Sequence, residues 1–298
     1  MGFSSCNFSD YSSIYTLTKL KFNSKSFARL VALLSLIPTS PITLWFAPYT
    51  EPFFTFLSYR AIIACERRQY TLAALFFAGA AAFRSNGIFL AGFILWHLIV
   101  APFFAKRQIN IFKAILLSTV VFLPFIAHHV SAYQIFCLAK DKPEWCTRRV
   151  PSIYTYVQSK YWNVGFLRYW TPSQIPNILL ALPTLSLIIS YSLRVLLNPS
   201  DLSTYNPHSY TSLGFLHLST ANDSQTPHAI HALFTSFILL FASHTQITLR
   251  LAPSMPILYW AAADLLIRHP RIGRLWVTWS FLWAAISVVL WLAFLPPA

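Results

Sequence analysis

Residues 111–136 read IFKAILLSTVVFLPFIAHHVSAYQIF, and this stretch decides the class of fold. Its 26 residues include one basic residue, Lys113, and no acidic residue. A helix needs about 20 predominantly apolar residues to cross a hydrocarbon core of about 30 Å. The stretch is long and apolar enough to do this, so it predicts a transmembrane helix.

Eight further apolar stretches repeat the pattern, and together they predict an all-α polytopic membrane protein with about nine spans. These stretches cover residues 22–37, 51–66, 69–84, 87–105, 174–197, 228–249, 254–267 and 275–296. The weakest are 69–84 and 254–267, because they are short for a full crossing. Residues 11–21 fit the tail of an earlier helix. We expect residues 1–298 to form a single membrane domain.

The composition supports a membrane protein. Hydrophobic residues make up 56% of the chain and charged residues 10%, against about 25% charged residues in a soluble domain. The net charge of +14 would indicate a nucleic-acid partner in a soluble protein. Because the basic residues flank apolar stretches and no nucleic-acid-binding motif is present, we expect no nucleic acid and favour membrane lipids with anionic headgroups.

The basic residues also predict the orientation of the spans. With nine spans, the side that begins at Lys19 holds twelve flanking basic residues and the opposite side holds eight. The positive-inside bias places the first side in the cytoplasm. Residues 137–173 are too polar for lipid and are predicted to form a loop on the non-cytoplasmic side. Residues 198–227, rich in Ser, Thr, Asn, Pro and His, are predicted to form a cytoplasmic linker.

Only eight residues are acidic, and most of them have an ordinary structural interpretation. Asp264 precedes Arg268 by four residues, which predicts an ion pair along one helix. Glu66 stands beside Arg67 and Arg68 and is expected to be a solvated or paired surface charge. These carboxylates are therefore weak candidates for chemistry.

Glu51 and Arg84 are stronger candidates for a functional site. Glu51 opens a predicted span and has no basic neighbour in the sequence. A charge stabilised by the helix dipole and a role in substrate contact or base function are both open. Arg84, with Asn86 close behind, stands between two apolar stretches. An ionisable residue at membrane depth indicates function, and an arginine that snorkels from a tight hairpin is the alternative.

Five more residues near predicted membrane boundaries have two interpretations each. His244, Gln246 and Arg250 either line a cavity or form hydrogen bonds between helices. Cys137 and Cys146 bracket a polar part of the long loop, where an oxidising compartment would allow a disulfide. Two free thiols are the alternative. No metal-ligand spacing and no phosphate-binding glycine loop is present.

Four motifs together resemble the GPI mannosyltransferase 2 family. They are APYTEP at residues 47–52, FRSNG at 83–87, YTYVQSKYWNVGFLRYW at 154–170 continued by QIPN at 174–177, and HTQ at 244–246 with Arg250 and LYW at 258–260. The motifs follow the order of the family and span most of residues 40–260. The aromatic block at 154–170 is the most specific of them.

The resemblance implies a multi-pass GT-C type glycosyltransferase of the endoplasmic reticulum membrane. Such an enzyme takes mannose from dolichol-phosphate-mannose on the luminal side and adds it by an α-1,6 linkage to the GPI precursor glycolipid. No cofactor and no metal is implied, while a small membrane subunit is an expected partner. A β-linked donor and an α-linked product imply one inverting displacement, which needs a carboxylate base and cations for the departing phosphate.

The resemblance also gives roles to individual residues. Glu51 is expected to be the catalytic base. The expected substrate-binding residues are Arg84, Asn86, Tyr161, Trp162, Asn163, Arg168, Trp170, His244, Gln246 and Arg250. The arginines are expected to contact phosphate, and the aromatic side chains with Asn163 are expected to contact sugar rings.

One feature of the family pattern has no counterpart here. The family carries a Trp-Asp pattern in its first luminal loop, and no such pattern precedes Glu51. We therefore expect a chain that is truncated at its N-terminus relative to the family fold. A non-catalytic membrane subunit, or an inactive fragment, is the alternative function. A transporter is a further alternative, because short helices and intramembrane polar groups fit one as well.

Overall fold

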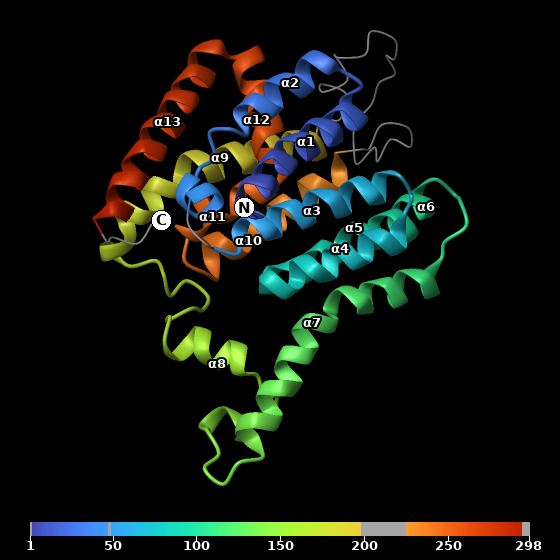
Figure 1. Ribbon diagram of the computed structural model, residues 1–298, viewed down its shortest axis with the longest axis vertical. Helices are drawn as coiled ribbons and strands as arrows, with labels where there is room; N and C mark the ends of the chain where they lie inside the picture. Colours follow the sequence, from blue (N-terminus) through green and yellow to red (C-terminus); the bar gives the residue numbers. More distant parts are fainter. Residues whose placement is uncertain (1, 47–48, 198–224, 294–298) are drawn as a thin grey trace.

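The computed structural model describes residues 2–46, 49–197 and 225–293, and every regular element in these ranges is a helix (Figure 1). The α-helices are α1 (Gly2–Phe22), α2 (Lys25–Leu34), α3 (Glu51–Glu66), α4 (Tyr70–Phe83), α5 (Ala91–Leu95), α6 (Ala101–Phe104), α7 (Ile111–Cys137), α8 (Ile153–Lys160), α9 (Ile175–Leu197), α10 (Thr226–Phe241), α11 (Ile247–Leu251), α12 (Pro256–Arg268) and α13 (Pro270–Leu292). Short 3-10 or π segments are η1 (Ile42–Phe46), η2 (Ser85–Leu90), η3 (Trp96–Val100), η4 (Glu144–Thr147), η5 (Pro172–Gln174) and η7 (Ala252–Ser254). The predicted all-α class is confirmed for the described residues.

Four helical stretches among the described residues are long and apolar enough to cross a membrane. They are Ser85–Phe104, Ile111–Cys137, Pro172–Leu197 and Pro270–Leu292, and each overlaps a predicted span. α4 and α10 are apolar but shorter. The structure thus supports four of the nine predicted spans by length and composition, and the total of nine stays a prediction.

Two predicted spans have different bounds in the structure. The predicted span 22–37 is too long, because α1 ends at Phe22, Asn23 follows with a left-handed φ of 48°, and α2 covers only Lys25–Leu34. Ser24 then caps α2 by accepting a hydrogen bond from the Phe27 N–H at 3.2 Å. The predicted span 228–249 is also too long, because α10 ends at Phe241 and helix resumes only with α11. The helix expected at 11–21 is confirmed by α1.

α3 and α4 form a hairpin of almost equal arms. They have 16 and 14 residues, which correspond to about 24 and 21 Å of helix. The turn between them is tight, with Arg68 at a φ of 60° and a hydrogen bond of 2.8 Å from the Gln69 N–H to the Ala64 carbonyl. The end of α4 therefore lies level with the start of α3, which brings Arg84 to the same end of the bundle as Glu51.

α12 forms the centre of the packed core. Every residue from Pro256 to Asp264 is buried, and α12 packs against α2, α9, α10 and α13. Trp260 is fully buried and donates its indole N–H to the Thr18 hydroxyl at 2.9 Å. The predicted pair of Asp264 and Arg268 is confirmed at 2.8 Å. Arg194 of α9 joins it from the other side at 2.5 Å.

Glu66 is paired in the structure, but with residues other than its sequence neighbours Arg67 and Arg68. Its carboxylate lies 2.5 Å from Lys21 Nζ and 3.4 Å from His97 Nε2, whereas Arg67 and Arg68 are exposed. The neighbouring arginines are not the partners, because α1 packs along α3 and places the Lys21 side chain beside the end of α3. Packing between helices thus overrides proximity in the sequence.

α7 lies at the edge of the bundle and bends, and its second half leaves the bundle (Figure 1). Pro124 lies inside this helix, where it removes a backbone hydrogen bond and favours a bend. The second half forms a small separate core from Ala132, Cys137, Trp145 and Tyr156.

A disulfide closes the start of the long loop. Cys137 and Cys146 are bonded to each other, with their Cα atoms 5.4 Å apart. The structure thus contains the bonded form of the two alternatives that the sequence left open. The luminal position of the loop at 137–173 stays a prediction. The predicted linker at 198–227 falls outside the described residues up to residue 224.

Candidate functional site

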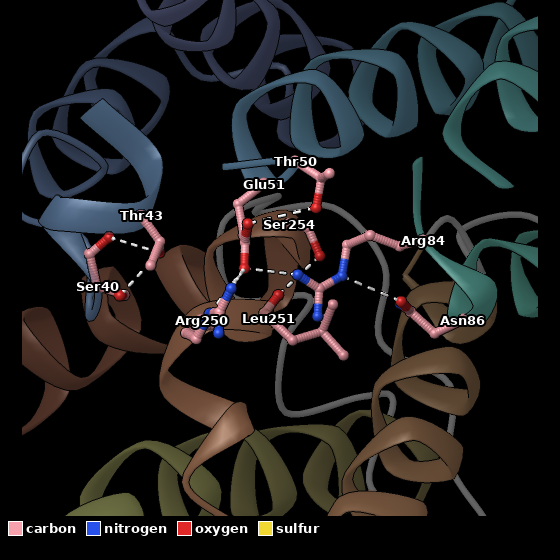
Figure 2. Close-up of polar contacts among 9 residues, drawn as sticks. All are labelled: Ser40, Thr43, Thr50, Glu51, Arg84, Asn86, Arg250, Leu251 and Ser254. Carbon is pink, nitrogen blue, oxygen red and sulfur yellow. Dashed lines mark hydrogen bonds and ion pairs between the residues drawn. The ribbon is translucent and has the colours of Figure 1, made fainter. Parts of the chain in front are cut away.

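The carboxylate of Glu51 lies between the guanidinium groups of Arg84 and Arg250 (Figure 2). Its Oε1 atom is 2.6 Å from Arg84 Nη1, 2.8 Å from Arg250 Nε and 2.5 Å from Arg250 Nη2. Its Oε2 atom has a longer contact, 3.5 Å from the Thr50 hydroxyl. Three residues that the sequence singled out separately therefore form one cluster of charges.

The turn after α4 sets the position of Arg84. Arg84 is the last residue before η2 and has an extended backbone, with φ −146° and ψ 133°. Gly87 closes the turn against α4, since a Cβ at this position would lie 2.5 Å from the Ala81 Cα. Asn86 orients the guanidinium by accepting a hydrogen bond from Arg84 Nε at 3.3 Å (Figure 2). The two residues predicted to bind substrate here are in direct contact.

Two buried hydrogen bonds hold the segment that carries Arg250. The Thr39 hydroxyl donates to the Leu249 carbonyl at 2.6 Å, and the Tyr59 hydroxyl donates to the Pro253 carbonyl at 2.5 Å. The Arg250 guanidinium also lies 4.8 Å from the centre of the Tyr49 ring, a distance that suits a cation–π contact. These contacts fix Arg250 on the short helix α11, which lies far from α3 and α4 along the chain.

The cluster of Glu51, Arg84 and Arg250 carries one net positive charge. Its two arginine side chains are more exposed to solvent than its carboxylate. The Glu51 side chain is 3% exposed, and those of Arg84 and Arg250 are 17% and 26% exposed. Both guanidinium groups contact the Glu51 Oε1 atom, so they lie within about 5 Å of each other. At this distance two unit charges repel by roughly 3 kcal/mol if the effective dielectric constant is about 20. The carboxylate offsets this repulsion.

Each arginine keeps a donor that no described residue of the protein uses. An arginine has five N–H groups. In the described part of the chain, Arg84 Nη2 and Arg250 Nη1 make no hydrogen bond to protein. Two charged groups with free N–H donors at one place can bind a phosphate group through charge-assisted hydrogen bonds.

The aromatic block makes a second set of contacts, with the C-terminal end of α10. The Trp170 indole N–H donates to the Leu240 carbonyl at 2.7 Å, and the Leu167 N–H donates to the Phe241 carbonyl at 2.6 Å. These bonds satisfy carbonyl groups that a helix leaves without partners at its end. The His244 Nε2 donates to the Trp162 carbonyl at 2.6 Å. Trp170 and His244 therefore hold the loop against α10.

The other predicted substrate-binding residues are not gathered at the charge cluster. Tyr161, Trp162, Asn163 and Arg168 are exposed along the loop. Among the described residues, none of them hydrogen-bonds to Glu51, Arg84 or Arg250. Gln246 stands at the start of α11, one turn before Arg250. The predicted contacts of Tyr161, Trp162 and Asn163 with sugar rings stay predictions. The phosphate contact of Arg168 and the substrate contact of Gln246 stay predictions as well.

Sequence reasoning missed several residues that support the site. Thr39, Tyr59 and Tyr49 hold or cover the Arg250 segment, and Ser85 donates a hydrogen bond to the Tyr154 hydroxyl at 2.9 Å. The bond from Ser85 ties α8 to the turn that bears Arg84. Tyr49 and Ser85 lie within the family motifs, whereas Thr39 and Tyr59 lie outside them. In each case the partner is far away in the sequence, so the sequence does not reveal the contact. In the part of the chain that the structure describes, no three His, Cys, Asp or Glu side chains gather as a metal site would require.

Comparison with known proteins identifies the family of the chain. The family model described as Mannosyltransferase (PIG-V) matches residues 11–298. The chain belongs to this family. The PIG-V family is a family of glycosyltransferases, so the enzyme class expected from the four motifs is confirmed at this level. The match also contains Glu51, Arg84 and Arg250, and the whole aromatic block.

Individual relatives agree with the PIG-V assignment. GPI mannosyltransferase 2 of Cryptococcus neoformans is 33% identical over 96% of this chain and 72% of its own length. The protein of the same name from Yarrowia lipolytica is 33% identical over 95% of this chain and 70% of its own length. GPI alpha-1,6-mannosyltransferase 2 of Mus musculus is 31% identical over 74% of this chain and 52% of its own length. No solved structure matches the chain.

Proposed function

We propose that the chain transfers the second mannose of the GPI anchor to the GPI precursor glycolipid. The donor is dolichol-phosphate-mannose, the linkage is α-1,6, and the reaction takes place on the luminal side of the endoplasmic reticulum membrane. The names of the relatives from Cryptococcus neoformans and Mus musculus support the pathway and the linkage. The remaining predicted spans complete a GT-C type bundle in this proposal, with a small membrane subunit and membrane lipids as partners.

The observation that carries the proposal is the pair of arginines around Glu51. When mannose leaves its lipid carrier, negative charge builds up on the departing phosphate. Arg84 and Arg250 have free N–H groups at the more open face of the cluster, and such groups stabilise a charge that develops in a transition state. The aromatic loop, which holds the end of α10, provides the surface for the sugar and lipid parts of the substrates.

The chemistry sets a requirement for the acceptor as well. An inverting displacement needs a base that takes the proton from the acceptor hydroxyl. The sequence predicts Glu51 for this task, but its side chain is 3% exposed and its carboxylate contacts both arginines, so we propose that another carboxylate serves as the base. The departing group is the lipid phosphate, which leaves with the electron pair of the broken bond and needs no metal if both arginines contact it.

Complementation tests this function. The chain is expressed in cells that lack the second GPI mannosyltransferase, and GPI-anchored proteins are measured at the cell surface. We expect the wild-type chain to restore them and the double variant Arg84→Ala, Arg250→Ala not to do so. Arg67→Ala is the matched control, because this arginine is exposed and lies at the opposite end of α3. A wild-type chain that reaches the membrane and restores nothing would contradict the proposal.

A further inference from the structure

Glu51 contacts its two arginines in an uneven way. Three N–H groups, one from Arg84 and two from Arg250, converge on Oε1, while Oε2 has only the Thr50 hydroxyl at 3.5 Å. We propose that Glu51 is a positioning residue, which holds Arg84 and Arg250 together as one phosphate-binding pair. This inference rests on the proposed function, because it assigns the carboxylate a task in binding the lipid phosphate.

Burial separates this role from that of a base. A general base must come within hydrogen-bonding distance of the proton that it takes. The Glu51 side chain is 3% exposed and both arginines are markedly more exposed. An acceptor that approaches the open face of the cluster meets the guanidinium groups before it meets the carboxylate. The geometry favours a carboxylate that acts through the arginines.

The need for a positioning residue follows from where the three side chains originate. Glu51 begins α3, Arg84 follows α4 and Arg250 lies on α11, 199 residues from Glu51 in the sequence. Two guanidinium groups repel each other when no anion lies between them. One phosphate can accept hydrogen bonds from both only if their free Nη atoms stay close together. The shared Oε1 atom provides this closeness before any substrate binds.

Binding of a sugar-free lipid phosphate tests the inference without any turnover. The purified full chain in detergent is titrated with dolichyl phosphate, and binding is followed by tryptophan fluorescence. We expect Glu51→Gln to weaken binding about tenfold or more, because small displacements of binding groups have large effects. Glu51→Asp keeps the charge on a shorter side chain and is expected to lose less affinity.

The controls address charge, folding and the source of the phosphate. Glu144→Gln removes an exposed loop carboxylate and should bind like the wild type. Inorganic phosphate serves as a second probe, and much weaker binding than that of dolichyl phosphate shows that the lipid form is the ligand. Equal affinity for both probes would overturn the assignment to a lipid phosphate. Each variant is compared with the wild type by gel filtration before it is titrated.

The outcomes separate this inference from the function on which it rests. If Arg84→Ala with Arg250→Ala weakens binding but Glu51→Gln binds as tightly as the wild type, or more tightly, the positioning role is wrong and the phosphate site stands. If the double arginine variant binds like the wild type, the phosphate site itself is wrong. If Glu51→Gln does not fold, Glu51→Asp decides, and an unchanged affinity overturns the positioning role.

Discussion

At the scale of single residues, Glu51 shows which part of a site a sequence can reveal. Glu51, Arg84 and Arg250 each stand out because a charged residue at the edge of an apolar stretch is costly without a purpose. Their meeting is hidden, since 199 residues separate Glu51 from Arg250. The contact between Glu51 and Arg84 could be predicted from the sequence. α3 and α4 have similar lengths and are joined by a short turn, so the start of α3 and the end of α4 lie at the same level.

The shape of the arginine side chains should matter as much as their charge. Arg84→Ala removes a donor to the departing phosphate and is expected to lower mannose transfer by about a hundredfold. Arg84→Lys keeps the charge but loses the planar fork of donors that contacts both Glu51 and Asn86, so its activity should stay well below that of the wild type. Transfer rates in isolated membranes measure both effects. A fully active Arg84→Ala variant would show that this arginine has no part in the reaction.

The aromatic residues show structural contacts that the sequence does not reveal. Trp170 and His244 were predicted to bind substrate; in the structure Trp170 donates to the Leu240 carbonyl near the end of α10, and His244 donates to the Trp162 carbonyl of the loop. Composition alone cannot distinguish a side chain that binds a sugar from one that closes a helix end, because an indole or an imidazole N–H suits both carbonyl and hydroxyl partners. The backbone contacts of Trp170 and His244 depend on where the carbonyl groups lie in the fold, and their role in binding substrate stays a prediction.

At the scale of elements, the turn between α4 and η2 should be sensitive to a single methyl group. A Cβ at residue 87 would lie 2.5 Å from the Ala81 Cα and 2.7 Å from the Ala81 N. We expect Gly87→Ala to push the turn outward, to destabilise the protein by about 1–3 kcal/mol and to lower activity by displacing Arg84.

Gly92→Ala is the matched control for this substitution. Gly92 lies on the next helix, and a Cβ there has no neighbour within 4 Å. In a helix, Gly→Ala at an open position is neutral or stabilises by less than about 1 kcal/mol. Thermal unfolding in detergent and transfer activity are measured for both variants. Equal behaviour of the two would contradict the close packing of the turn on α4.

The disulfide defines a second element whose behaviour can be tested. It closes a loop between residues nine apart in the sequence, and a short loop of this kind adds about 2–3 kcal/mol by restricting the open chain. We expect Cys146→Ser to make residues 138–152 more sensitive to limited proteolysis. Cys65→Ala is the control, since Cys65 is a free buried cysteine in α3. An identical digestion pattern for Cys146→Ser and the wild type would argue against a stabilising bond.

At the scale of the whole molecule, long apolar stretches in the sequence predict the class of fold well, but they predict the ends of the helices less well. The stretch at 111–136 corresponds to α7 almost residue for residue. The span predicted at 22–37 corresponds to the shorter α2, which begins only after Asn23, the left-handed residue that separates it from α1. Hydropathy records how apolar a segment is, but a break in a helix depends on one backbone conformation.

Ion pairs at this scale follow the packing of the bundle. The pair of Asp264 and Arg268 could be predicted because both lie on one helix. The partner of Glu66 could not be predicted in this way. Lys21 comes from α1, which is far from Glu66 along the chain and packs against α3 only in the folded protein. Contacts within one helix can be predicted from the spacing of residues in the sequence. Contacts between helices can be predicted only when the fold is known.

We propose above all that this chain transfers mannose to a GPI precursor and that Arg84 and Arg250 bind the departing phosphate. The most direct measurement incubates the purified chain with radiolabelled dolichol-phosphate-mannose and a GPI precursor that bears one mannose. We predict label in the glycolipid through a bond that an α-1,6-specific mannosidase releases, and no label with Arg84→Ala, Arg250→Ala. A folded wild-type chain that transfers no label, or a double variant that transfers as much as the wild type, would contradict the account.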